Sequence, residues 1–577
     1  MELPEPTLCR SCGTDLGGTL APGTCPSCGA PVEMPTASTA APSGPGAPDA
    51  PALATHKHPA VEMLTVALPT VVTMTSYTVM QFIDGLMVSR IGADGVYLAA
   101  QGNGGMAMWL TISFTLGLTT VINTYVSQHL GAGTPERGAR YAWVGLYLSL
   151  MTTLPMLALI PFLPSIFAMG GHGGRLLELE SRYAQILFFG AFFTLGARAV
   201  AHYFYGMHRP LVVMSAVLLA QVVNVFANAV LIFGGEGPGE GMSVGPFGWF
   251  FELTASFAGA LGIPAMGVAG AALGTLLGTA VEFLIPIAIF LGPMNAKYAT
   301  RAAWRCGWGA FKNVLRIGWP GGLMFVNEMA CWGYLMAVML KAGGEAAAVH
   351  AAGGPGVLTQ AEVTEAGVAH NAAGWIALRY MHLSFMPAVG LSIGVTAIVG
   401  RCMGMGRPDL AAARAKLGLQ IGVVYMGLCA GAFVIFREPM VRLFLPEGLS
   451  SEETARMVSI GAAVMIAAAV FQVFDAIAIV LSGALRGAGD TVWPGVATVV
   501  CSWTCIIVLG HALIVFAPQL GSMGPWIGAS AFVIVLGVLL SFRFAGGKWK
   551  TIKLVHDDHT PKQPDPGISG GNLPGEA

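Results

Sequence analysis

The sequence predicts an all-α integral membrane protein, with twelve transmembrane helices in two six-helix halves and a small N-terminal module rich in cysteine. Three observations favour this fold class. Of the 577 residues, 55% are hydrophobic and only 10% are charged, whereas roughly a quarter of the residues of a soluble domain are charged. Apolar runs recur that are long enough to cross a bilayer, which takes about 20 residues each. Finally, two long segments of the chain repeat one another.

The apolar runs define the predicted spans in order. Each is dominated by aliphatic, aromatic and small residues, and the abundance of glycine fits helices that pack closely in lipid. The spans are expected at residues 62–89, 96–125, 139–163, 182–206, 210–234, 261–291, 315–340, 368–399, 414–436, 455–483, 492–516 and 523–544. The segment 234–262, which carries Trp249 and Phe250 and has no lysine or arginine, is expected to fold back against the membrane interface.

An internal repeat divides the membrane part into two halves. The stretch LGLTTVINTYVSQHLGAGTPERGAR, from Leu116, matches VGLSIGVTAIVGRCMGMGRPDLAAA, from Val389. The spacing is the same in both copies for Gly117, Gly131 and Pro135 and for Gly390, Gly404 and Pro408. We therefore expect parallel halves at residues 60–300 and 301–545, an architecture typical of transporters that alternate access around a central site.

The N-terminal segment carries two cysteine pairs, CRSC and CPSC. The spacing of Cys9, Cys12, Cys25 and Cys28 predicts a zinc ribbon over residues 1–30, with four thiolates around one structural Zn2+. A pair of disulfides is the alternative, but a cytosolic segment is kept reduced. Residues 31–59 read as a flexible Pro/Ala/Ser linker and residues 546–577 as a disordered tail. A protein partner of the zinc module stays unknown.

Lysine and arginine residues indicate the orientation. Most of those near span ends fall on the side that also holds the N-terminus, so the positive-inside rule predicts cytoplasmic N- and C-termini. No cleavable signal peptide is expected, because the N-terminus has cysteines where an apolar segment would be needed. These features predict a multi-pass protein of the cell inner membrane, a monomer in the lipid bilayer with no nucleic-acid partner.

Three acidic residues lie inside predicted spans: Asp84, Glu328 and Asp475. An acid within the membrane is a functional hypothesis by default, because its burial must be offset by a proton, an ion or a partner. Gln81 and Gln472 precede two of these acids by one helical turn and could donate hydrogen bonds to them.

A purely structural role for these acids remains an alternative, through ion pairs with Arg198 or Arg379, which also lie in predicted spans. Glu282, in the sixth span, is interpreted as a lipid-headgroup or packing residue. The methionines of the first span are interpreted as packing residues, or as the lining of an adaptable cavity.

Three motifs carry a family resemblance: FIDGLMVSRIGADGVYLAAQG, NVFANAVLIFG and LSGALRGAGDT. With the repeat, they make residues 60–545 similar to the multidrug and toxic compound extrusion (MATE) family. The resemblance implies a secondary antiporter that exports organic, often cationic, compounds in exchange for H+ or Na+. In the NorM-like branch, the positions matching Asp84, Glu328 and Asp475 are implicated in cation coupling.

The sequence departs from the family pattern at two positions. Where the DinF-like branch has an asparagine and then an aspartate on the fifth helix, this chain has Asn224 and Asn228. Where many NorM-like members have a tyrosine before the tenth-helix aspartate, it has Phe471. The first-half proton relay therefore lacks one titratable group. The second-half site lacks a possible hydroxyl ligand for sodium, and this second departure favours protons over sodium as the coupling ion.

Other function classes were weighed against transport of organic cations. A lipid-linked glycan flippase of the same superfamily would need a strongly cationic cavity, whereas the charges identified within the spans are mainly acidic. A membrane enzyme is not expected, because the chain has no HExxH, aspartate-rich or Walker A motif. A non-transporting sensor that uses the zinc module as its output is a further alternative.

Overall fold

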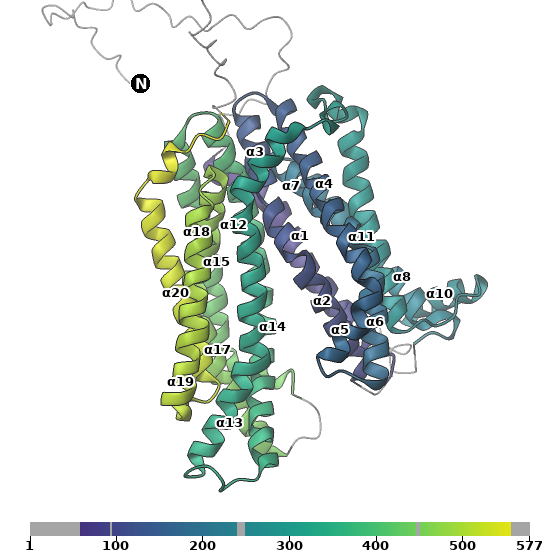
Figure 1. Cartoon of the computed structure of the whole chain (residues 1–577), viewed down its shortest axis with the longest axis vertical. Helices are drawn as coiled ribbons and strands as arrows, with labels where there is room; N and C mark the ends of the chain where they lie inside the picture. Colours follow the sequence, from purple (N-terminus) through teal and green to yellow (C-terminus); the bar gives the residue numbers. More distant parts are fainter. Residues whose placement is uncertain (1–57, 93–94, 239–247, 446–449, 556–577) are drawn as a thin grey trace, which may run out of the picture. The chain divides into compact units, whose positions relative to one another are not determined.

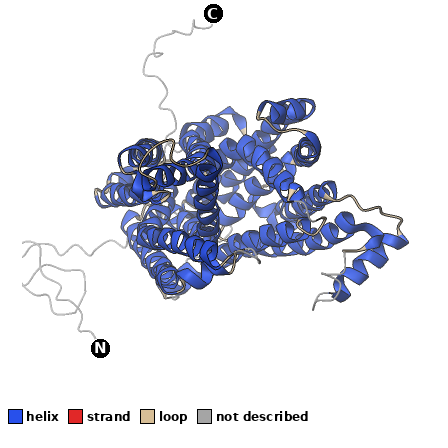
Figure 2. Ribbon diagram, turned by 90° about the horizontal axis from the view of Figure 1, so that it is seen from below, coloured by secondary structure: helices blue, strands red, loops and turns tan. Residues whose placement is uncertain are grey.

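The computed structural model describes residues 58–92, 95–238, 248–445 and 450–555. The described residues form helices joined by turns, with no strand among them (Figure 2). The four cysteines of the expected zinc ribbon, the linker up to residue 57 and most of the C-terminal tail lie outside the described residues.

Ten α-helices and four short 3-10 turns make up the first half as far as the structure describes it. The α-helices are α1 (Pro59–Val88), α2 (Val96–Thr119), α3 (Val121–Gly131), α4 (Pro135–Leu159), α5 (Leu163–Met169), α6 (Gly174–Phe189), α7 (Ala191–Gly206), α8 (Pro210–Phe233), α10 (Gly248–Ala260) and α11 (Val268–Leu291). The 3-10 turns are η1 (Ile160–Phe162), η2 (Gly234–Glu236), η3 (Pro293–Tyr298) and η4 (Ala302–Trp304).

The second half contains longer helices and two π-helical segments, η5 and η6. Its α-helices are α12 (Gly307–Tyr334), α13 (Leu340–Ala351), α14 (Gln360–Gly404), α15 (Pro408–Ile435), α16 (Arg437–Arg442), α17 (Ser451–Ala488), α18 (Val492–Cys501), α19 (Gly510–Phe516) and α20 (Met523–Ala545). The π segments are η5 (Leu335–Met339) and η6 (Ser502–Leu509), and two 3-10 turns follow, η7 (Pro518–Leu520) and η8 (Lys548–Thr551).

The number of membrane spans agrees with the sequence. Eleven helices of the described residues are long and apolar enough to cross a bilayer, and the bent pair α6 and α7 makes twelve if it is one span. This pair corrects the predicted span 182–206, because the helix begins at Gly174 and bends by 47° near Gly190. Leu276 occupies the space that a side chain at position 190 would need.

Two spans of the second half are much longer than expected. The helical segments Gly307–Ala351 and Gln360–Gly404 have 45 residues each, whereas about 20 suffice to cross a bilayer. Their extra turns correspond to the predicted loop between residues 340 and 368, where the alanine-rich sequence favours helix without being strongly apolar. Thr359 starts α14 with a capping box to Glu362.

The segment expected to fold back forms helix α10. Phe251 is buried there while Trp249 is 65% exposed, and Phe257 contacts Phe226 of α8. Its position at the membrane interface stays a prediction.

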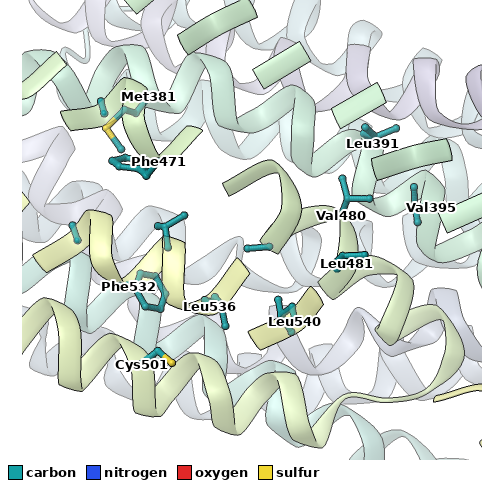
Figure 3. Close-up of a cluster of buried hydrophobic side chains, with 14 of the residues drawn as sticks. Met381, Leu391, Val395, Phe471, Val480, Leu481, Cys501, Phe532, Leu536 and Leu540 are labelled. Carbon is teal, nitrogen blue, oxygen red and sulfur yellow. The ribbon is translucent and has the colours of Figure 1, made fainter. Parts of the chain in front are cut away.

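Each half has its own apolar core, and the first helix of each half also enters the core of the other. Met63 and Val66 of α1 belong to the cluster of the second half, part of which Figure 3 shows between α14, α17 and α20. Val314 and Ile317 of α12 belong to the cluster around α3, α4 and α7. Helix α1 packs against α14 and helix α2 against α12. In Figure 1, α12 and α14 are labelled in one group of helices, and α1 and α2 in the other.

Glycines of the internal repeat lie where the halves meet. Gly117 faces Gly321 of α12, and its repeat equivalent Gly390 faces Val71 of α1. Gly131 and Gly404 each face a backbone carbonyl group of the other half. Gly131 and Gly404 lie at one end of the helices, together with the start of α1 and the α3–α4, α7–α8 and α14–α15 turns. We call this the basic end. A side chain larger than hydrogen at these glycines would push the two halves apart.

Candidate functional site

The first-half site joins α1 and α8 through a hydrogen-bonded group of three side chains. The amide nitrogen Nδ2 of Asn228 donates to Oδ1 of Asp84 at 2.7 Å and to Oδ1 of Asn224 at 3.1 Å. Asn228 is fully buried and Asn224 is 5% exposed. The two asparagines are four residues apart on α8, so they occupy one helix face directed at α1. The structure therefore brings three of the predicted site residues together.

Helix α11 closes this site with two glycines that sequence reasoning missed. A Cβ atom at Gly274 would collide with Oδ1 of Asn228, and one at Gly278 would lie 2.8 Å from Cβ of Asn224. The two glycines form the pattern Gly-x-x-x-Gly, which lets helix backbones approach closely in membranes. That pattern is readable in the sequence and could have identified α11 as the wall of the site.

The second-half acids lie on different helices, Glu328 on α12 and Asp475 on α17. Their carboxylates interact electrostatically, and the charge of Arg486 also acts on Glu328. Both side chains are partly exposed. Asn327, beside Glu328 in the sequence, donates to Ser502 at 2.7 Å and accepts from Trp503 at 2.9 Å. It thereby ties α12 to the π segment η6, a type of distortion that is frequent at functional sites.

The predicted glutamines are placed differently from the acids they precede. The amide of Gln472 donates to Oγ of Ser384 on α14 at 2.8 Å, where a bond to Asp475 was expected. Gln81 is exposed on α1. The bond of Gln472 goes to another helix, so Ser384 is the residue that sequence spacing could not supply.

The structural alternative for the three acids finds no support in the described residues. There, no ion pair joins Asp84, Glu328 or Asp475 to an arginine. Arg379 lies instead over the ring of Phe444, 5.3 Å from its centroid.

The interpretation of Glu282 as a lipid-headgroup or packing residue is wrong. Its Oε1 accepts a 2.6 Å hydrogen bond from the hydroxyl of Tyr77 and lies 3.8 Å from Nη1 of Arg198. The Arg198 guanidinium lies 4.1 Å from the centroid of the Tyr77 ring. Glu282 therefore belongs to a polar group inside the first half, between α1, α7 and α11.

These arrangements are suited to binding and releasing small cations. A carboxylate in a poorly solvated site is costly when charged and unpaired, so a proton or another cation that reaches it is held strongly. Within the described residues, no cluster of three or more metal-binding side chains occurs. The methionines of the first span, Met74, Met80 and Met87, are buried, and Met87 belongs to an apolar cluster.

Comparisons with known proteins agree with this architecture. The MatE family model matches residues 69–230 and 357–511. The "Probable multidrug resistance protein NorM" of Bradyrhizobium diazoefficiens is 26% identical over 486 residues, covering 84% of this chain and 92% of that protein. A protein of the same name from Thermotoga maritima is 25% identical over 513 residues, with 85% and 93% covered.

Solved structures share the fold at lower sequence identity. A MOP superfamily transporter from Pyrococcus furiosus superimposes with a TM-score of 0.69 at 20% identity, covering 85% of this chain and 97% of that one. The eukaryotic MATE transporter AtDTX14 gives a TM-score of 0.68 at 16% identity, with 85% and 96% covered. Because the family model matches more than half of the residues, the chain belongs to the MatE family of membrane transporters.

Proposed function

We propose that this protein is a secondary antiporter for multidrug efflux, which exports organic cations across the inner membrane in exchange for protons. The observation that carries the proposal is the presence of three membrane acids, two of which, Glu328 and Asp475, interact electrostatically, and none of which forms an ion pair with an arginine in the described part of the chain. The protein is a transporter and not an enzyme. The NorM relatives, whose names describe multidrug resistance, support the same substrate class.

Coupling follows from competition at the second-half acids. Glu328 and Asp475 interact electrostatically, so ionisation of one opposes ionisation of the other, and a single positive charge relieves both. A proton and an organic cation therefore exclude each other. Protonation releases the substrate on one side of the membrane, and deprotonation on the other side restores the binding form.

Asp84 plays a different part, because Asn228 donates a hydrogen bond to it. We assign proton binding within the first half to Asp84, with Asn224 and Asn228 as its hydrogen-bonded support. The protonation state of Asp84 then alters the packing of α1 against α8. Sodium coupling is less favoured, since Phe471 offers no hydroxyl ligand near Asp475. In this assignment, the basic end faces the cytoplasm.

Ethidium binding to the purified full-length protein across pH tests the coupling pair. Wild-type affinity should rise with pH as the acids deprotonate. Asp475→Asn mimics a permanently protonated side chain and should weaken binding about tenfold or more at high pH, which corresponds to about 1.4 kcal/mol. Glu328→Gln should behave in the same way, while Asp84→Asn should change the pH dependence less.

Gln420→Leu, at an exposed position of α15, is a matched control. If Asp475→Asn and Glu328→Gln both keep the wild-type pH dependence, these residues are not the coupling pair. Ethidium flux in reconstituted vesicles, driven first by a proton gradient and then by a sodium gradient, decides the coupling ion.

For the N-terminal segment we propose one structural zinc ion on Cys9, Cys12, Cys25 and Cys28. The support is their spacing, which is typical of tetrahedral zinc sites. We expect one equivalent of zinc in the purified chain and its loss when these cysteines are replaced by serine. A chain that starts at Thr55 should keep its transport flux.

A further inference from the structure

A histidine set between two pairs of glycines lies at the turn from α5 to α6. The sequence Gly-Gly-His-Gly-Gly covers residues 170–174, and Gly171 and Gly174 have φ angles of 85° and 59°, which favour glycine. The turn places the ring of His172 parallel to that of Phe167, with 6.2 Å between centroids. The side chain of His172 remains 34% exposed, so the turn holds a titratable group in a fixed place open to solvent.

The partner of His172 is an acid that the coupling scheme does not use. Nδ1 of His172 lies 2.8 Å from Oε1 of Glu180, whose side chain is fully buried. The other oxygen, Oε2, accepts a 2.8 Å hydrogen bond from Asn103 of α2. Glu180 is thus an interior carboxylate whose contact with solvent passes through a histidine.

Tyr183, on the same helix as Glu180, lies near the first-half site. Tyr183 lies one turn further along α6 and is 5% exposed. It packs in a cluster with Met87 of α1 and Ala100 of α2, and it interacts electrostatically with Asp84. Gly104 of α2 leaves room for the Tyr183 ring, since a Cβ there would lie 2.8 Å from it.

We propose that His172 and Glu180 form the entry station through which external protons reach Asp84. A proton binds Nε2 of His172, and the proton on Nδ1 passes to Oε1 of Glu180, so the imidazole ends neutral and the acid protonated. Glu180 then releases its proton inwards, past Tyr183 of the same helix, and Asp84 accepts it. Histidine suits this role because its charge changes within the physiological pH range.

The inference rests on the proposed proton coupling and on the α5–α6 turn facing outwards. Other charged or titratable groups surround the pair. On α6 they are Arg175, which donates to Tyr97 of α2 at 2.7 Å, and the exposed Glu178 and Arg182. Asp84 approaches from α1, and α5 carries no titratable side chain. None of them replaces His172 in its contact with Glu180.

The test measures the initial rate of ethidium transport by the full-length protein in reconstituted vesicles, at several pH values on the His172 face. His172→Gln can still donate to Glu180 but cannot titrate. Its rate should match wild type near about pH 6, where protons are abundant, and fall about tenfold below it near about pH 8. Ethidium exchange without a proton gradient should stay at the wild-type rate. His350→Gln, an exposed histidine on α13, is the matched control.

Two outcomes overturn the inference while leaving the proposed function intact. One is a wild-type pH profile in both His172→Gln and Glu180→Gln. The other is a loss that is equal at every pH and also affects exchange, which indicates a structural clamp between α2 and α6. If wild-type flux does not respond to a proton gradient at all, the proposed proton coupling fails and the entry station fails with it.

Discussion

At the scale of single residues, the closest fit in the first-half site lies between Gly274 and Asn228. Gly274→Ala would force its new methyl group against Oδ1 and the backbone nitrogen of Asn228. Because backbone cannot rotate away, α8 and α11 must separate, at a cost of about 1 to 3 kcal/mol. We expect a lower melting temperature and a loss of proton-driven ethidium transport of about tenfold, as Asn228 withdraws from Asp84.

Gly427→Ala is the control for this substitution. Gly427 also lies within a helix, α15, but no atom approaches the position of its Cβ within 4 Å. Wild-type transport by Gly274→Ala would show that the contact between Asn228 and Asp84 is dispensable.

His208, between α7 and α8, makes the contact between halves sensitive to pH. Its Nε2 lies 3.1 Å from the carbonyl oxygen of Ala397 on α14. Burial, reinforced by the charge of Arg401, lowers the pKa of His208 to about 4. The unfolded chain therefore takes up this proton first, and the stability that neutral His208 provides is lost as pH falls from about 6.5 towards 4.

His208→Asn tests this contribution. Asparagine tolerates the positive φ of 57° at this position but does not titrate. The fall in melting temperature between about pH 7 and pH 5 should be smaller than in wild type. An unchanged fall would assign the acid sensitivity to other groups.

At the scale of helices, the repeat glycines set how closely the halves approach. Gly404 faces the backbone of Gln128 in α3, and the amide of Gln128 in turn donates to Gly487 of α17 at 3.0 Å. Gly404→Ala should therefore open the basic end. Spin labels at Glu136 and Arg407, in a background without other cysteines, should report a longer distance between the halves. Gly427→Ala is again the control. Gly406→Ala cannot take that place, because the φ angle of Gly406 is 70°, which favours glycine.

Part of this helical arrangement could be predicted from the sequence. Apolar runs gave the number of spans, because membrane crossing imposes a length that composition reveals. They missed the ends of α13 and α14, where alanine-rich turns continue a helix without raising hydropathy. The acids were found because a charge within an apolar run is conspicuous, and Asn228, the partner of Asp84, was among the expected site residues. The residues that hold Gln472 and Asn228 in place were not found. Ser384 and Gly274 come from other helices, and one sequence cannot show which helix faces which.

At the scale of the whole molecule, an ion pair between Arg414 and Glu62 joins the two halves at the basic end. Arg414 of α15 donates to Oε2 of Glu62 on α1 through Nη2 at 2.8 Å and through Nε at 2.9 Å. The two side chains are only 15% and 16% exposed. Alternating access requires the halves to separate at this end, so the pair must break in each transport cycle.

Removal of either partner should therefore shift the conformational equilibrium. Glu62→Gln or Arg414→Gln leaves the other charge without its partner in the closed form, at a cost of about 1 to 3 kcal/mol. The population with an open basic end should rise about tenfold, which corresponds to 1.4 kcal/mol, and the label pair at positions 136 and 407 measures it. The reversed pair, Glu62→Arg with Arg414→Glu, should restore the wild-type distance. Restoration would show that the attraction between these two charges closes this end, whereas a reversed pair as open as the single variants would show that it does not suffice beside Arg401, whose charge also acts on position 62.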